Sequence, residues 1–211
     1  MYLFAFDMDG TLTYSSSWYD LVKEYGDEKI SKRLKQRYYN GEISYEEWIE
    51  KLIAIFRKNN LNKEEVQRIM ASYSLIEGIE DFISFLREKV KEKVYLTIIS
   101  SGILERARKI ARQLNFDSYH CVSFRYDKEG YVVGIETMIK PEHKRDILKN
   151  LIWKYAPKKV IAIGDSDFDI PMMKLADLKI SVNNEIGEHD VDYHGKDYYE
   201  IIEFFQKEIK L

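Results

Sequence analysis

The chain of 211 residues is long enough for one medium-sized α/β domain, or for a core domain with a small insert. A net charge of −3 gives no electrostatic reason to expect a nucleic-acid partner, and the apolar runs are too short to span a membrane. The single cysteine, Cys121, excludes an internal disulfide framework. This cysteine content fits a reducing compartment, and no charged-then-apolar leader precedes the first strand, so we expect a cytoplasmic protein.

Several short apolar runs do not alternate with polar residues, and this pattern predicts strands that are buried on both faces of a parallel sheet. Most of them are followed by small or acidic residues and then by a helical pattern, which is typical of βα units. Sheets built in this way bind ligands beyond the carboxyl ends of their strands. The strands predicted from this pattern are residues 2–6, 94–99 and 160–163, and residues 178–182 are predicted as a further strand.

An all-helical segment, residues 15–73, separates the first two of these strands. Ser44 begins a capping box with Glu47, and Asn62 is a good N-cap with Glu65 three residues later. An insert of this size directly after a first strand predicts a helical lid over a site at the end of that strand. The predicted helices of the insert are residues 16–25, 28–39, 45–57 and 63–72.

The rest of the chain completes an α/β pattern. Residues 119–124 and 131–138 flank a turn in which Gly130 adopts positive φ easily, and this arrangement predicts a β-hairpin. Further helices are predicted at residues 79–90, 141–155 and 197–209. The expected fold class is α/β, with a doubly wound, mostly parallel, Rossmann-like sheet and a small helical cap inserted after the first strand. The expected domains are an α/β core of residues 1–14 and 76–211, and a helical cap of residues 15–75.

The first cluster of chemical interest is the acidic turn that follows the strand at residues 2–6. Residues two apart in an extended segment point to the same side, so Asp7 and Asp9 are expected to approach one another there. Gly10 lets the backbone turn and lets a ligand come close. One carboxylate can attack phosphorus while a neighbouring carboxyl protonates the leaving oxygen. A solvated acidic turn is the alternative, but the apolar strand before it favours a functional site.

The second and third candidates carry weaker signals. Ser100-Ser101-Gly102 follows the strand at residues 94–99, where a hydroxyl group and exposed backbone N–H groups at a helix start would bind an anion. Serine and glycine are also ordinary turn residues, so this cluster is weak when it is taken alone. Lys144 is a candidate cation on the helix at residues 141–155. Its spacing does not separate it from three other lysines, which are Lys140, Lys149 and Lys154.

The fourth candidate, from Gly164 to Asp169, again places acids at the end of an apolar strand. Hard cations such as Mg²⁺ prefer oxygen ligands, although one of these acids can also cap the following helix. A phosphate dianion beside Asp7, Asp165 and Asp169 would gather about five negative charges, and such crowding costs several kcal/mol. The charge count therefore predicts a Mg²⁺ ion and one lysine beside the phosphoryl group.

Taken in this order, the four clusters resemble the motifs of the haloacid dehalogenase superfamily of phosphatases. The first and fourth motifs are specific, and the other two gain weight from their order and context. The early helical insert resembles the cap of the phosphoserine phosphatase branch, so the resemblance covers the whole chain. The matching residues are Asp7-x-Asp9-Gly10-Thr11, Ser100, Lys144 and Gly164-Asp165-x-x-x-Asp169.

The resemblance implies a Mg²⁺ cofactor and a phospho-aspartyl intermediate. Asp7 would be the nucleophile and a metal ligand, and Asp165 would bind the same metal. Asp9 would act first as a general acid and then as a base, with its backbone carbonyl also on the metal. Asp169 would orient the waters of the metal and Lys144, and Thr11 would support the site.

The resemblance also implies how the phosphate is held. Ser100 and Lys144 would contact the phosphoryl oxygens, with Ser101 and Gly102 helping. The implied substrate is a small-molecule phosphate ester, with no nucleic acid or membrane as a partner. The sequence does not indicate an oligomeric state.

Three positions depart from the phosphoserine phosphatase pattern. Ser16 stands where that branch has a glutamate for the substrate ammonium, and Leu52 stands near its arginine for the substrate carboxylate. Phe168 replaces the asparagine that commonly precedes the last aspartate. Recognition of a buried zwitterion depends on charge-assisted hydrogen bonds, so the changes at Ser16 and Leu52 argue against L-phosphoserine as the substrate. Five aromatic residues of the cap can line the substrate space, although packing is the favoured role for each: Trp18, Tyr38, Tyr39, Tyr45 and Trp48.

Three alternatives to this function remain open at this stage. One is a phosphoserine phosphatase proper, and another is a phosphotransferase that uses the same chemistry. The third, from a different class, is a phospho-accepting receiver module of signalling. A receiver carries paired acids after its first strand, but it normally has its phospho-accepting aspartate later in the chain and lacks a long helical insert.

Overall fold

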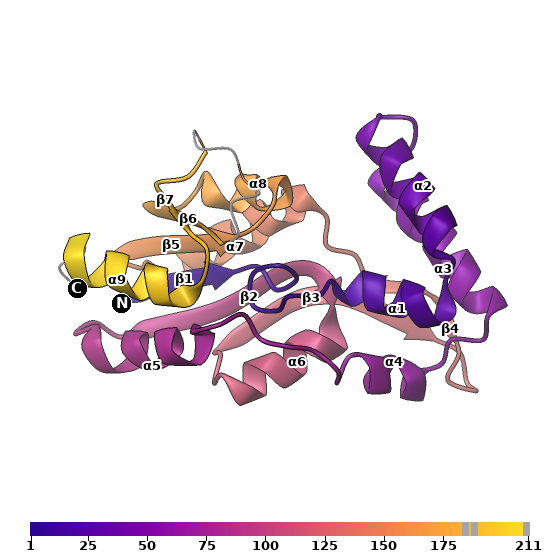
Figure 1. Cartoon of the computed structure of the whole chain (residues 1–211), viewed down its shortest axis with the longest axis horizontal. Coiled ribbons are helices and arrows are strands. Elements are labelled where there is room, and N and C mark those ends of the chain that lie inside the picture. The colour runs from indigo at the N-terminus through magenta and orange to yellow at the C-terminus, as the bar shows by residue number, and fades with distance from the viewer. Residues whose placement is uncertain (183–185, 187–189, 209–211) are drawn as a thin grey trace.

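The computed structural model describes residues 1–182, 186 and 190–208 (Figure 1). Seven strands in this described part form one sheet, in the order β4-β3-β2-β1-β5-β6-β7. Neighbouring strands are parallel except for the hairpin of β3 and β4. The strands are β1 (Tyr2–Phe6), β2 (Val94–Ile103), β3 (Ser118–Tyr126), β4 (Val132–Thr137), β5 (Lys159–Gly164), β6 (Leu178–Val182) and β7 (Tyr193–Gly195).

Helices cover both faces of this sheet and also form a separate group on one side of it (Figure 1). The separate group is α1 (Ser17–Tyr25), α2 (Glu28–Tyr39), α3 (Tyr45–Lys58) and α4 (Lys63–Ile69). One face of the sheet carries α5 (Ile79–Lys89), α6 (Leu104–Gln113) and α9 (Tyr198–Glu208). The opposite face carries α7 (Pro141–Tyr155) and the short α8 (Ile170–Met173), which follows a 3₁₀ turn at Asp167–Asp169.

The central strand, β1, is apolar on both sides because helices cover both of its faces. Phe4 and Phe6 belong to the apolar cluster that contains α5, α6 and α9. Leu3 and Ala5 point the other way, into the cluster that contains Leu148 of α7. Side chains of a strand alternate between its two faces, so a strand buried on both faces must be apolar throughout. This requirement explains the continuous apolar run that the sequence shows at β1.

The predicted fold class is confirmed, and most predicted elements have the expected type and position. The strands predicted at residues 2–6 and 178–182 have those bounds, while the strand predicted at residues 94–99 continues to Ile103. The predicted hairpin forms from β3 and β4. The short strand β7 was not predicted. The last predicted helix is α9, and Ile209 lies outside the described residues.

Helix α4 ends at Ile69, three residues before the predicted boundary. Beyond it the N–H groups of Ala71 and Ser72 bond to carbonyl oxygens three residues back, which tightens the last turn. The carbonyl of Ser72 is then free of the helix and accepts a hydrogen bond from Arg106. The early end of α4 therefore supplies a contact between the insert and the core.

The helical insert has its own apolar core, which also includes part of the hairpin. Leu52 and Phe56 of α3 lie in one cluster with Phe124 of β3 and Val132 of β4. An isolated bridge joins Asn62 to the hairpin turn as well. The cap at residues 15–75 therefore rests on β3 and β4, while its boundaries as a domain remain a prediction.

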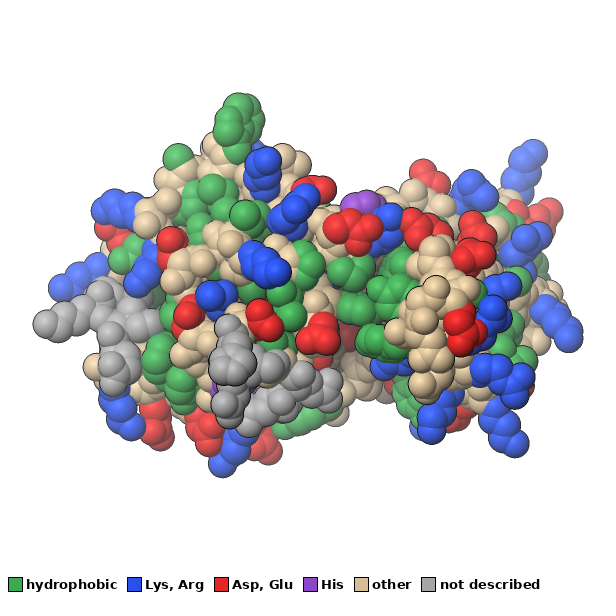
Figure 2. Space-filling model, turned by 90° about the horizontal axis from the view of Figure 1, so that it is seen from above, with side chains coloured by type: hydrophobic (Ala, Val, Ile, Leu, Met, Phe, Trp, Pro, Cys, Tyr) green, Lys and Arg blue, Asp and Glu red, His purple; other side chains and the backbone are tan. Residues whose placement is uncertain are grey.

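Two connections join the cap to the core, and they run side by side. Thr13 on the incoming connection pairs with Leu75 on the outgoing one in an antiparallel bridge. The N–H of Tyr14 donates to the carbonyl of Ser74 at 3.1 Å. In the space-filling view, the core and the cap form two lobes of unequal size that both carry many charged side chains (Figure 2). The paired connections are thus a short two-stranded ribbon between the lobes.

None of the helices in the described part of the chain combines the length and the apolar character that crossing a bilayer requires.

Candidate active site

The acidic turn after β1 brings its two carboxylates to the carboxyl edge of the sheet, as predicted. Asp7 is buried, with 5% of its surface exposed, and its N–H donates to the carbonyl of Ile163 on β5 at 2.9 Å. The carboxylate of Asp9 accepts hydrogen bonds from the N–H and hydroxyl of Ser17, at 2.8 and 2.6 Å. Asp9 therefore faces the start of the cap, whereas Asp7 faces the core.

Gly10 is required at this turn for two physical reasons. Its φ is +86°, a left-handed conformation that favours glycine. A Cβ atom at this position would lie 2.3 Å from Oδ2 of Asp165, so any side chain would displace that carboxylate. Thr11 lies beside it and donates from Oγ1 to Oδ1 of Asp165 at 2.9 Å. The turn after β1 thus fixes an acid that comes from the end of β5.

Lys144 is the lysine that the fold selects from the four candidates. It is buried on α7, and its Nζ lies 2.8 Å from Oδ1 of Asp7 and 2.6 Å from Oδ1 of Asp169. Burial opposes its charge, but Asp169 and Asp7 more than offset that effect and raise the pKa of Lys144 above its ordinary value. Lys140, by contrast, pairs with Glu46 of the cap and with Glu142.

Three carboxylates from two segments meet around the end of β1. Oxygen atoms of Asp7, Asp165 and Asp169 all lie within 4.8 Å of one another. The second oxygen of Asp169 accepts from the N–H groups of Asp165 and Ser166, at 3.1 and 3.2 Å. Gly164 makes this possible, since a Cβ there would lie 2.5 Å from the Asp169 carboxyl. The cluster is assembled by tight backbone turns at the ends of β1 and β5.

The electrostatics of this cluster fit a bound cation. Burial, followed by the charge of Asp169, raises the pKa of Asp7 to about 7. Burial and the charges of Asp7 and Asp169 raise the pKa of Asp165 to about 9. Lys144 alone leaves the carboxylates in excess, and their oxygens are the ligands that hard divalent ions prefer. The donor set therefore suits a metal ion, which Asp7 and Asp165 would hold.

The segment from Ser100 to Gly102 lies in β2 rather than at the start of a helix, because β2 continues to Ile103. The N–H of Gly102 donates to the hydroxyl of Ser100 at 3.0 Å, and the N–H of Ile103 donates to the hydroxyl of Ser17 at 2.9 Å. These two N–H groups are therefore not exposed, contrary to the expectation for an anion site.

Ser100 nevertheless lies at the acidic cluster. It is fully buried, and a hydrogen bond from it lowers the pKa of Asp7, against the larger effect of burial. Gly102 allows close packing, since a Cβ there would lie 2.8 Å from Oδ2 of Asp9. The carbonyl of Ser101 accepts a hydrogen bond from the indole of Trp18 at 2.8 Å, which joins β2 to the cap. Contact of these residues with a phosphate stays a prediction.

Two residues beside Asp9, Ser17 and Arg106, were not found from the sequence. Ser17 begins α1 and is fully buried under Asp9. Arg106 lies on α6, is also fully buried, and places Nη1 3.9 Å from Oδ1 of Asp9. Burial raises the pKa of Asp9, while Arg106 and Ser17 act in the opposite direction. No local motif marks either residue, because each meets Asp9 only through the tertiary fold.

The three departures from the phosphoserine phosphatase pattern have structural roles. Ser16 is the N-cap of α1 and accepts from the N–H of Tyr19. Leu52 is 2% exposed and packs in the apolar core of the cap. Phe168 stacks on Tyr39 of the cap, with ring centroids 6.2 Å apart. Neither Ser16 nor Leu52 therefore offers a charge to a ligand.

All five cap aromatics pack against other rings, as favoured from the sequence. Tyr38 stacks on Trp48, and Trp18 stacks on Phe56. Tyr45 packs against Trp48 and is also buried near the charges of Lys144 and Asp7, and burial raises its pKa to about 12. Tyr45 is the cap aromatic that these interactions place beside the acidic cluster.

Comparison with known proteins supports the assignment that this geometry suggests. A family model described as haloacid dehalogenase-like hydrolase matches residues 1–177, which include every candidate site residue. The chain therefore belongs to the haloacid dehalogenase-like hydrolase family and is an enzyme. This membership sets aside the receiver module as an alternative.

Within that family the chain belongs to the phosphoserine phosphatase-like branch. It is 27% identical over 184 residues to a phosphoserine phosphatase of Methanocaldococcus jannaschii, covering 85% of this chain and 84% of that protein. It is 26% identical over 201 residues to the human phosphoserine phosphatase, covering 92% of this chain and 87% of that protein. These similarities extend through both the core and the cap.

Solved structures share the fold. One described as a phospho-aspartyl intermediate analogue of phosphoserine phosphatase has a TM-score of 0.81 at 24% identity, and covers 96% of this chain and 97% of its own. A haloacid dehalogenase family hydrolase from Salmonella enterica has a TM-score of 0.86 at 16% identity, and covers 100% of this chain and 72% of its own.

Proposed function

We propose that this enzyme is a Mg²⁺-dependent phosphatase that hydrolyses a small phosphate monoester through a phospho-aspartyl intermediate on Asp7. The observation that supports this proposal best is the meeting of Asp7, Lys144, Asp165 and Asp169 in one buried cluster. Phosphoryl transfer depends mainly on positioning and on stabilisation of negative charge, and this cluster suits both. Mg²⁺ would supply the positive charge that the three carboxylates and the phosphate require.

In the proposed first step, an oxygen of Asp7 attacks phosphorus while the bond to the leaving oxygen breaks. Asp9 gives its proton to that oxygen. Lys144, already paired with Asp7, screens the negative charge of the phosphoryl oxygens, and the hydroxyl groups of Ser100 and Ser101 contact them.

In the proposed second step, water attacks phosphorus and gives a proton to Asp9, and the bond between Asp7 and phosphorus breaks. The products are the alcohol and inorganic phosphate, and both acids regain their starting state. Asp9 lies between the core and α1 of the cap, where it can act in both steps.

The proposed substrate lacks the paired charges of phosphoserine. The hydroxyl of Ser16 is used at the start of α1, and Leu52 is buried in the apolar core of the cap. The relatives named above carry the name phosphoserine phosphatase, so L-phosphoserine is the substrate to test against this proposal. The proposed partner is a small metabolite of the cytoplasm, and the single, buried Cys121 agrees with a reducing compartment.

Ethyl phosphate is the matched comparison for L-phosphoserine, because it lacks only the ammonium and carboxylate groups. We expect kcat/KM for the two esters to differ by less than about threefold, since no charge-assisted hydrogen bond at Ser16 or Leu52 distinguishes them. Release of inorganic phosphate in Mg²⁺ measures both rates. A preference of about 100-fold for L-phosphoserine would contradict the proposed substrate class while leaving the phosphatase chemistry intact.

A further inference from the structure

Arg106 is a fully buried arginine on a helix whose other basic residues are exposed. It is the largest of the fully buried side chains in the described part of the chain. Arg108, Lys109 and Arg112 of the same helix, α6, are exposed instead. A guanidinium group loses its hydration when it is buried, so it is retained only where charged and polar partners surround it. Its partners therefore indicate what Arg106 does.

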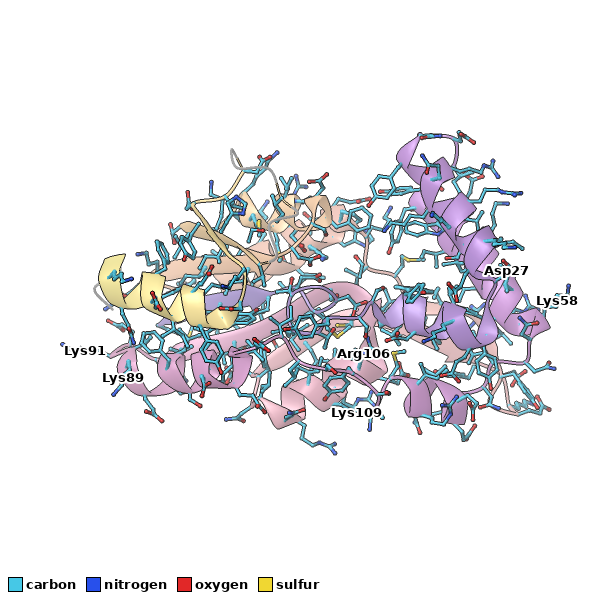
Figure 3. The ribbon with its side chains drawn as sticks, in the orientation of Figure 1. Asp27, Lys58, Lys89, Lys91, Arg106 and Lys109 are labelled. Carbon is cyan, nitrogen blue, oxygen red and sulfur yellow. The ribbon has the colours of Figure 1, made fainter. Side chains whose placement is uncertain are left out.

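The partners of Arg106 join three parts of the molecule. Its Nη2 lies 2.6 Å from Oδ2 of Asp20 on α1. On the incoming connection of the cap, Nη1 donates to the carbonyl and hydroxyl of Ser15, at 3.1 and 3.2 Å. On the outgoing connection, Nη2 donates to the carbonyl of Ser72 at 3.4 Å. Figure 3 shows Arg106 near these connections, far from Lys89 and Lys91 at the other end of the core.

The second carboxylate near Arg106 is that of Asp9. Nη1 of Arg106 lies 3.9 Å from Oδ1 of Asp9, while Oδ2 of Asp9 is fixed by two hydrogen bonds from Ser17. Within the described residues, Oδ1 of Asp9 and Nε of Arg106 are both buried and have no hydrogen-bond partner. Ser17 therefore holds one oxygen of the carboxyl, and the arginine is the cation that faces the other.

We propose that Arg106 is a positioning residue for Asp9, holding its free oxygen towards the leaving group, and that it links this orientation to the two connections of the cap. This inference rests on the proposed role of Asp9 as proton donor. With Oδ2 held by Ser17, the charge of Arg106 opposes rotation of the carboxyl and keeps Oδ1 in place. Because Ser15 and Ser72 hold the same guanidinium, a shift of the cap connections would also move it away from Asp9.

Leaving-group dependence separates this role from a structural one. The nitrophenolate of para-nitrophenyl phosphate leaves without a proton, whereas the alkoxide of ethyl phosphate needs one. We expect Arg106→Met to lower kcat/KM for ethyl phosphate by about 10- to 100-fold and that for para-nitrophenyl phosphate by less than about threefold. A merely structural loss would reduce both values together. Equal losses on the two substrates would overturn the proposal.

Arg87 provides a matched control. It also donates to two backbone carbonyls, those of Val94 and Asn115, and it pairs with the carboxylate of Asp117. It does not contact Asp9. We expect Arg87→Met to leave the ratio of the two kcat/KM values within about twofold of the unmodified enzyme. If Arg106→Met does not fold, Arg106→Lys is measured instead. It retains the buried charge but not the planar fork, and the same difference between substrates is expected, with a smaller loss.

The Asp9→Asn variant tests whether the proposed role of Asp9 is sound. It should show the same discrimination against ethyl phosphate, and adding Arg106→Met to it should change the ratio no further. If Asp9→Asn lowers kcat/KM equally for the two substrates, the assignment of Asp9 as the proton donor fails. If Asp9→Asn discriminates and neither Arg106→Met nor Arg106→Lys does, the phosphatase mechanism stands and the inference about Arg106 alone is wrong.

Discussion

Replacing Asp7 with asparagine is expected to lower kcat by at least about 10⁴-fold, because an amide cannot form the phospho-aspartyl bond. The substitution keeps the shape of the side chain, and its amide oxygen can still accept from Lys144. The measurement is release of phosphate from para-nitrophenyl phosphate in Mg²⁺. Full activity in purified Asp7→Asn would refute the covalent mechanism.

The same variant is expected to remain folded, and this provides its control. Burial raises the pKa of Asp7 to about 7, so the ionised carboxylate is disfavoured in the metal-free protein. Asparagine carries no charge and relieves the repulsion from Asp169 and Asp165. The unfolding temperature of Asp7→Asn in a chelator should therefore equal or exceed that of the unmodified chain. A large fall would show that the loss of activity came from unfolding.

Removing the divalent ion with a chelator is expected to abolish turnover and to make stability depend on pH in a particular direction. The folded-state pKa values of Asp7 and Asp165, about 7 and about 9, lie above their unfolded values. A group of this kind contributes most at low pH, and its contribution falls as the pH rises through the folded value. The metal-free enzyme should therefore lose stability as the pH rises from about 5 to about 8. Asp7 contributes to this fall up to its folded pKa of about 7, and Asp165 contributes throughout the interval.

Added Mg²⁺ should oppose this loss, because it favours the ionised carboxylates. The gain in unfolding temperature on adding Mg²⁺ is therefore expected to be larger at about pH 8 than at about pH 5. Calorimetry at both pH values, once in chelator and once in Mg²⁺, measures this gain in unfolding temperature. Asp165→Asn should remove much of the dependence. A metal-free unfolding temperature that rises over this interval would contradict the proposed metal site.

The core of the fold was predictable because helices cover both faces of its central strand, and an apolar side chain is therefore required at almost every position of that strand. β1 is covered on both faces, so its apolar run alone locates it at residues 2–6. Helix α3 was located by a capping box that the structure contains. The strand β7 has three residues at the edge of the sheet, and it forms by pairing with β6 rather than through any pattern of its own.

The site divides in the same way between local and tertiary signals. The turn from Asp7 to Thr11 and the segment from Asp165 to Asp169 are local motifs whose backbone geometry requires particular residues, so the sequence located the three clustered acids. Arg106 reaches Asp9 from a helix that lies far along the chain. No spacing rule connects the two, and only the packing of α6 beneath the cap connections reveals the contact.

The central position of β1 affects how the enzyme is made. Tyr2 pairs with Val94 on one side and with Lys159 on the other, so both neighbours of this strand follow the cap in the sequence. During synthesis β1 cannot pair until both of these later strands have been made, and pairing between strands that are distant in the sequence is slow. A nascent chain that stops before β5 contains Asp7 but neither Asp165 nor Asp169. Such a chain lacks two of the three clustered acids, so the proposed hydrolysis cannot begin until the sheet is complete.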